Sequence, residues 1–184
     1  MRLLIKIFLV FFIPIAFASE AKKEAKKEAE IANLKFPVEN QQKGDVKAIR
    51  NFNSQAKRIF ESIVSDDADA VKDTFISESA FAAIKDMPGS AAYYSKLTNW
   101  YKQDLKKEHE RLKGLKDLKF DSFKLGFCKW KAAGSEYNKI PYWSCYKSQI
   151  LAKTKDKTHS IAVKVMINWG EEWYVTHLGP IPKN

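Results

Sequence analysis

Apolar side chains recur at steps of three and four between Asp45 and Ile63, a spacing that predicts an amphipathic helix with Asp45 as its N-cap. Its apolar positions are Val46, Ile49, Phe52, Ala56, Ile59, Phe60 and Ile63. A polar break over 65–67 separates this helix from a second helical stretch over 68–76. A short helical turn is expected over 79–87, where Pro88 and Gly89 stop it.

A third and longer helix is expected from about Ser90 to Leu118. Its apolar stripe consists of Leu97, Tyr101, Leu105, Leu112, Leu115 and Leu118, and lysines fill much of the remaining surface. A coiled-coil partner is the alternative use of such a stripe, but the periodic stretch is short and Glu108 interrupts it. The pattern favours packing of this stripe against a sheet of the same chain.

After Lys119 the pattern changes to that of strands, expected over 120–131, 142–153, 160–169 and 173–178. In the third strand every second residue is apolar, with Lys164 and Asn168 on the opposite face. Residues 170–172 predict a tight hairpin into the fourth strand. Helices followed by a run of strands predict an α+β fold, in which N-terminal helices pack on a curved antiparallel sheet, as a single domain over 45–184.

The two cysteines test this arrangement. Cys128 faces Cys145 in an antiparallel pair if Gly134 pairs with Lys139 across a loop of four residues. An even number of cysteines suits an oxidising compartment, and their separation excludes a redox motif of the C-x-x-C kind. The pattern predicts a structural disulfide between adjacent strands.

The first 18 residues have the parts of a secretory signal peptide: the basic residues Arg2 and Lys6, an apolar run, and Ala16 and Ala18 before the expected cleavage. A retained membrane anchor is the alternative, but the apolar run is shorter than a membrane span. Residues 19–44 are expected to form a charged helical spacer and a loop. The chain is therefore expected to be periplasmic or secreted, with no stable membrane span after cleavage.

Charge and composition narrow the chemistry only a little. The full chain carries a formal net charge of +10, but its bases are spread widely and many have acids nearby, which indicates a solvated surface. Nucleic acid is not an expected partner of an exported chain. His109, His159 and His177 show no metal-ligand spacing, so neither a metal nor another cofactor is expected.

Two segments resemble the nuclear transport factor 2-like superfamily. Residues 60–75 are similar to its opening motif of helix, polar turn and second helix, and residues 167–175 are similar to its closing hairpin. The resemblance implies a cone in which a bent sheet wraps around a long helix, with a pocket between the sheet and the helices. Because the superfamily includes isomerases, dehydratases, transport factors and secretion components, the resemblance does not imply one activity. Many domains of this fold form homodimers through the open face of the sheet.

Aromatic side chains are the candidates for lining such a pocket. The predicted ligand-binding residues are Tyr94, Trp100, Phe127, Trp130, Trp143 and Trp169, with Phe81, Tyr93 and Tyr142 as further candidates. The alternative is that these aromatic side chains fill the core of the cone.

Catalytic motifs are scarce in this sequence. His177 in the last strand is the one candidate, with Asp104 or Asp121 as a carboxylate partner. The sequence therefore favours a non-enzymatic exported domain that binds a small apolar ligand or an envelope protein. The alternatives are an isomerase or hydro-lyase using His177, and an assembly module of a secretion or surface complex.

Overall fold

The computed structural model describes residues 43–85 and 87–179, all of which belong to the compact unit Lys35–Asn184. The expected signal peptide over 1–18 lies outside the described residues. So does the expected spacer over 19–44, apart from Lys43 and Gly44.

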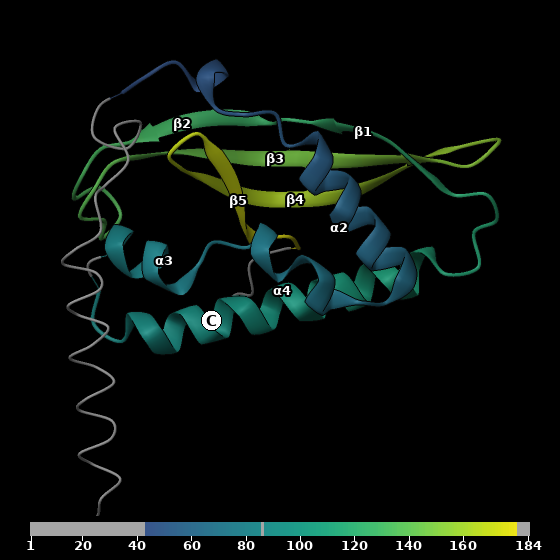
Figure 1. The fold of residues 1–184 in the computed structure, drawn as a ribbon, viewed down its shortest axis with the longest axis horizontal. Coiled ribbons are helices and arrows are strands. Elements are labelled where there is room, and N and C mark those ends of the chain that lie inside the picture. Colours follow the sequence, from purple (N-terminus) through teal and green to yellow (C-terminus); the bar gives the residue numbers. More distant parts are fainter. Residues whose placement is uncertain (1–42, 86, 180–184) are drawn as a thin grey trace, which may run out of the picture. The chain divides into compact units, whose positions relative to one another are not determined.

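In the described part of the chain, five helical segments precede the strands. They are the short 3-10 helix η2 (Val46–Ala48), α2 (Asn53–Ser65), the 3-10 segment η3 (Ala68–Thr74), α3 (Glu78–Ile84) and α4 (Ser90–Leu112). Figure 1 shows α4 running roughly along the long strands, and α2 crossing from the sheet to α4.

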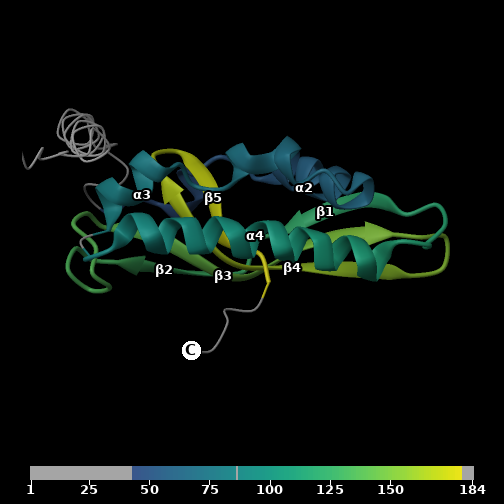
Figure 2. The same ribbon diagram turned by 90° about the horizontal axis from the view of Figure 1, so that it is seen from below.

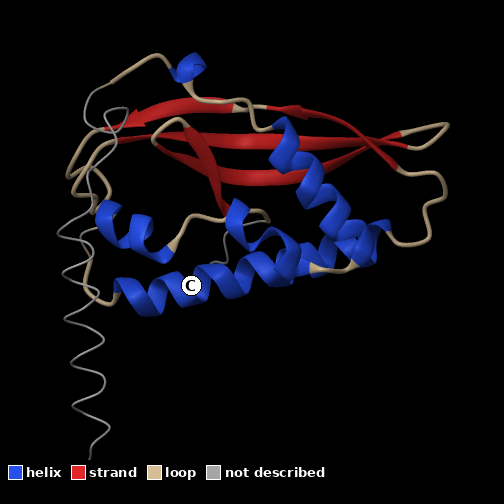
Figure 3. Cartoon of the chain, viewed as in Figure 1, coloured by secondary structure: helices blue, strands red, loops and turns tan. Residues whose placement is uncertain are grey.

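Five strands form one antiparallel sheet that is curved and does not close. They are β1 (Lys119–Lys124), β2 (Phe127–Lys131), β3 (Tyr142–Lys153), β4 (Thr158–Trp169) and β5 (Glu172–His177). The order is β1-β3-β4-β5, and β2 pairs with β3 beyond the end of β1. Figure 3 shows the helices and the sheet as separate layers, which confirms the expected α+β class.

The first expected helix is interrupted. Asp45 caps the short η2 instead of a long helix, and a new helix begins at Asn53, whose N–H donates to Asn51 Oδ1 at 2.7 Å. Between them Arg50 leaves the helical path, because its N–H donates to Glu171 O at 2.7 Å in the β4–β5 hairpin. A contact with a residue so distant in the sequence overrides the local apolar periodicity.

Two further boundaries differ from expectation. Helix α4 ends at Leu112 instead of Leu118, and Gly114 follows with a φ of 87°. The strand expected over 120–131 is divided into β1 and β2 at Gly126, whose N–H donates to Ser148 Oγ at 3.0 Å. A Cβ atom on Gly126 would lie 1.9 Å from Tyr146 O, so only glycine allows this close approach of β3.

The expected disulfide is present. Cys128 faces Cys145 in the β2–β3 pair and is bonded to it, and the loop closes with Gly134 N–H donating to Asn138 O at 2.7 Å. The bond is consistent with an oxidising environment. It joins the short edge strand β2 covalently to the central strand β3.

The core lies between the sheet and the helices. Its fully buried side chains include Ile59 and Ile63 of α2, Leu97 of α4, and Ile150 and Ile161 of the central strands. Figure 2, seen from below, shows α2, α3 and α4 in front of the strands. Asn168, expected on the polar face of β4, is also buried. Its Oδ1 accepts a hydrogen bond from Trp143 N–H at 2.7 Å, which satisfies this oxygen away from water.

Candidate functional site

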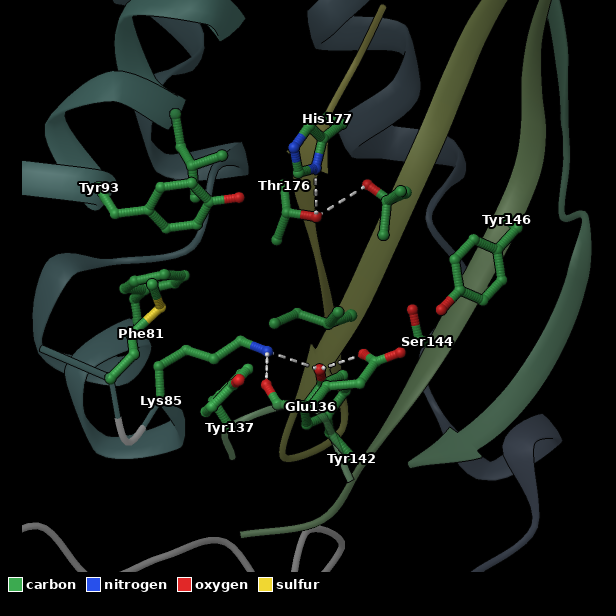
Figure 4. A pocket seen from close by; sticks show the side chains of 14 residues that line it. Phe81, Lys85, Tyr93, Glu136, Tyr137, Tyr142, Ser144, Tyr146, Thr176 and His177 are labelled. Carbon is green, nitrogen blue, oxygen red and sulfur yellow. Dashed lines mark hydrogen bonds between the residues drawn. The ribbon is translucent and has the colours of Figure 1, made fainter. Parts of the chain in front are cut away.

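A pocket of about 390 Å³ lies between the sheet and the helices α3 and α4 (Figure 4). Its aromatic lining comes from α3, α4, the β2–β3 loop and β3, and consists of Phe81, Tyr93, Tyr137, Tyr142 and Tyr146. Its aliphatic lining consists of Met87, Leu97, Val165 and Ile167. The volume lies in the range of small-molecule sites.

Strand alternation explains why these side chains converge. Tyr142, Ser144 and Tyr146 are every second residue of β3, so all three project from the same face of the sheet. On β4, Ile167 faces Ser144 and Val165 faces Tyr146, which places them on that face as well. The floor of the pocket is therefore built from the two central strands.

A hydrogen-bonded chain of polar groups closes one end of the pocket. Lys85 Nζ donates to Tyr142 OH at 3.0 Å and to Glu136 O at 3.1 Å. Tyr142 OH donates in turn to Glu136 Oε2 at 3.2 Å, and Lys131 forms an ion pair with the other carboxylate oxygen of Glu136. Figure 4 shows Lys85, Tyr142 and Glu136 converging at this end.

Burial changes the acidity of these groups. It lowers the pKa of Lys85, an effect that the Glu136 carboxylate partly opposes. Burial also raises the pKa of Tyr142 far above its ordinary value, so its hydroxyl stays protonated and donates. Burial by itself would raise the pKa of Glu136. The hydrogen bond from Lys131 and the nearby charges outweigh this effect, so the pKa is lowered. At neutral pH this end of the pocket contains ammonium groups and one carboxylate.

The opposite end of the pocket holds His177 and Thr176 of β5 (Figure 4). His177 Nδ1 lies 3.4 Å from Thr176 Oγ1, and that hydroxyl donates to Val165 O. His177 Nε2 is buried and has no hydrogen-bond partner among the described residues. Since the Thr176 proton is directed to Val165, its oxygen accepts from Nδ1–H, and Nε2 is left as a free acceptor.

The electrostatics of His177 favour the neutral ring. Burial lowers its pKa, and the Asp104 carboxylate opposes that effect. Asp104 does not form a hydrogen-bonded dyad with His177, because its Oδ2 accepts from Gly179 N–H at 2.9 Å. Asp121, the other expected carboxylate partner, is paired with Lys153 at 2.6 Å.

Of the six aromatic residues predicted to bind a ligand, none is among the residues that line this pocket. Tyr94 packs against Phe75 and Phe81 and donates to Ile76 O, so it fills the core beside the pocket. Trp100 lies beside His177, which lines the pocket, with a ring centroid 6.4 Å from that of the histidine.

The remaining four predicted residues lie on the sheet. Phe127 is 49% exposed and stacks on Tyr146 with ring centroids 5.3 Å apart, at the edge of the pocket. Trp130 and Trp143 form an edge-to-face pair on the opposite face of the sheet, the face of the disulfide. Trp169 is partly buried against the core. Their role in binding stays a prediction.

Of the further aromatic candidates, Phe81, Tyr93 and Tyr142 do line the pocket. The sequence reasoning missed the polar members Lys85 and Glu136, because each lies outside the regular pattern of an element. Lys85 ends α3, and Glu136 belongs to the loop between β2 and β3. An available signal was the spacing of Tyr142 from Tyr146, which marks one face of β3.

Within 43–85 and 87–179, no group of three or more His, Cys, Asp or Glu side chains is placed to hold a metal ion. In the same part of the chain, no helix has both the length and the apolar character needed to cross a bilayer.

Comparison with known proteins gave no relative. No protein-family model matches the chain, and the searches of curated proteins and of solved structures gave no match either. The resemblance to the nuclear transport factor 2-like superfamily therefore stays a prediction that rests on residues 60–75 and 167–175. The fold and the site therefore define only a general class, an α+β domain with a pocket between its sheet and its helices.

Proposed function

We propose that this chain is a non-enzymatic, exported binding domain that holds a small molecule with a largely apolar body in the pocket between the sheet and the helices. The observation that carries the proposal is the lining, in which aromatic and aliphatic side chains from α3, α4, β3 and β4 surround a volume of about 390 Å³. The cross-strand disulfide supports a location outside the cytoplasm.

The lining favours a small ligand over an envelope protein as the occupant. Phe81 and Tyr142 are almost fully buried, and Tyr93 and Tyr146 are only partly exposed, so their rings face a recess instead of an open surface. A protein partner would need a flat or grooved surface of larger area. A small molecule with a flat ring or a short chain matches the recess better than a protein surface does.

The first experiment is native mass spectrometry of the mature protein purified from an oxidising compartment. A bound small molecule released on denaturation supports the proposal. The uncharged fluorophore N-phenyl-1-naphthylamine then serves as a probe, and Val165→Phe fills the pocket. Loss of probe binding in Val165→Phe is expected.

The matched control is Val64→Phe, which adds the same side chain on the exposed surface of α2. This variant should bind the probe as the wild type does. Equal binding by both variants would show that the probe does not occupy the pocket, and would contradict the proposal.

The second candidate function is an isomerase or hydro-lyase, favoured by one observation: within residues 43–85 and 87–179, the buried Nε2 of His177 has no hydrogen-bond partner. A neutral imidazole of this kind accepts a proton from carbon or oxygen. If His177 is a base, the molecule that copurifies should exchange a carbon-bound hydrogen in D₂O, and His177→Gln should stop the exchange. Absence of exchange in the wild type would end this candidate.

A further inference from the structure

Three lysines lie in or beside one end of the pocket, each with its ammonium group near an aromatic ring; Lys85 lines the pocket, and Lys129 and Lys131 belong to the neighbouring strand β2. Lys85 Nζ lies 5.3 Å from the ring centroid of Tyr142, Lys131 Nζ 5.6 Å from that of Tyr146, and Lys129 Nζ 5.8 Å from that of Phe127. We call Lys85, Lys129 and Lys131 the lysine cluster.

The β2–β3 register places the lysine cluster on the pocket side of the sheet. Facing residues of an antiparallel pair project to the same side. Lys131 faces Tyr142 and Lys129 faces Ser144, and both of these β3 residues line the pocket. Lys85 reaches the same place from the end of α3, where its Nζ donates to Tyr142 OH.

The cluster has more positive charge than its surroundings neutralise. Within the described residues its one ion-pair partner is Glu136, which binds Lys131. Lys129 is exposed and has no ion-pair partner in that part of the chain. Lys85 is half-buried, and its two hydrogen bonds go to a backbone carbonyl and a neutral phenol. Three ammonium groups therefore face one carboxylate.

A half-buried ammonium without a carboxylate partner costs free energy, and an incoming anion would remove that cost. The lowered pKa of Lys85 is consistent with this environment. The aromatic rings beside the lysines supply flat apolar surface immediately next to the charge, so one ligand can use both.

We propose that the ligand is an organic anion, with its acidic group held by the lysine cluster and its apolar body on the tyrosines of the pocket. This inference rests on the proposed function and names its ligand class. A carboxylate, sulfonate or phosphate ester on a small ring or short chain fits this description. Lys129 is exposed, so the acidic group stays near solvent.

The test compares two probes that differ by one sulfonate group. 8-Anilinonaphthalene-1-sulfonate carries a sulfonate on the skeleton of the neutral N-phenyl-1-naphthylamine. The wild type should bind the sulfonate about tenfold more tightly, as expected for one charge-assisted contact. Rising salt should weaken binding of the sulfonate and leave the neutral probe unchanged.

The variant Lys129→Gln/Lys131→Gln should remove this preference while it keeps the affinity for the neutral probe. Its matched control is Lys155→Gln/Lys157→Gln, which removes the same charge at the β3–β4 hairpin at the other end of the strands (Figure 1). Lys85→Met, which keeps the aliphatic length, should also weaken binding of the sulfonate. Melting curves establish that each variant is folded.

The outcomes separate the two proposals. If the neutral probe binds and Val165→Phe blocks it, but the sulfonate binds no more tightly, the inference of an anionic ligand is wrong and the binding function stands. If Lys155→Gln/Lys157→Gln weakens sulfonate binding as much as Lys129→Gln/Lys131→Gln does, the overall charge of the protein explains the preference and the lysine cluster is not the site. If Val165→Phe affects neither probe, both proposals fail.

Discussion

At the scale of single residues, the backbone at Gly126 is a tight constraint. The edge strand approaches β3 so closely there that an added Cβ would lie 1.9 Å from the carbonyl oxygen of Tyr146. The obstacle is backbone, which cannot rotate away as a side chain can.

Gly126→Ala should therefore lower the free energy of unfolding by about 3 kcal/mol, because β2 must shift away from β3. Urea denaturation measures the change. Gly44→Ala is the control, since nothing lies within 4 Å of its added Cβ, and it should be neutral. Equal stability of the two variants would contradict the described approach of the strands.

His177 gives a second prediction at this scale. Its pKa in the folded protein lies below the ordinary value of 6.5, so the folded state binds fewer protons than the unfolded state in mildly acidic solution. Its contribution to stability is complete above pH 6.5 and is lost as the pH falls toward the lowered pKa.

The measurement is the free energy of unfolding at pH 7.5 and at pH 5.5. The wild type should lose more stability between these values than His177→Gln, whose side chain does not titrate. A wild type and variant with the same pH dependence would show that the ring is not held neutral.

The sequence reveals some of these residues and not others. The register of Cys128 opposite Cys145 follows from two residues and a sensible loop, and the structure confirms it. The size of an aromatic side chain makes it a candidate for the pocket, but strand alternation decides which side of β3 it occupies. Tyr142 and Tyr146 share the pocket face, and Trp143 lies on the other.

At the scale of elements, the sequence pattern predicts which segments form strands, but it does not predict where a helix or strand is interrupted. Strand β3 has the expected bounds, Tyr142–Lys153, because alternation is a local signal. The break before α2 comes from Arg50, whose guanidinium pairs with Glu171 and Glu172. No pattern within a helical window encodes a partner more than a hundred residues away.

The disulfide gives the prediction for elements. Replacing both cysteines, as in Cys128→Ser/Cys145→Ser, should lower the free energy of unfolding by about 3 kcal/mol, for a loop with a sequence separation of 17. The short strand β2 should also become more mobile. Because it carries Lys129 and Lys131, binding of the sulfonate should then weaken more than binding of the neutral probe. An unchanged ratio of the two affinities would mean that hydrogen bonds alone hold the lysines of β2 in place.

At the scale of the whole molecule, the strand order predicts where the fold is most resistant to opening. Strands β3 and β4 have hydrogen-bonded neighbours on both sides, and Ile150, Ile161 and Val163 are fully buried between them and the helices. Strand β2 pairs with β3 alone.

Hydrogen exchange tests this difference. Amides of Ile150 and Val163 should exchange only through global unfolding, and amides of β2 through smaller openings with lower free energy. A bound anion should slow exchange in β2 more than in the β3–β4 hairpin. If β2 exchanged as slowly as β4 in the free protein, the pocket edge would be rigid before any ligand arrives.

The bond between Cys128 and Cys145 also sets an order of events in the life of the molecule. While the thiols are free, the lysines on β2 and the tyrosines on β3 are joined by the hydrogen bonds of a five-residue edge strand and by aromatic contacts such as that of Phe127 with Tyr146, with no covalent link between the strands. Oxidation makes the two strands one covalent unit. On the proposed function, a newly made chain should therefore hold an anion only weakly, and its affinity should rise once its cysteines have been joined.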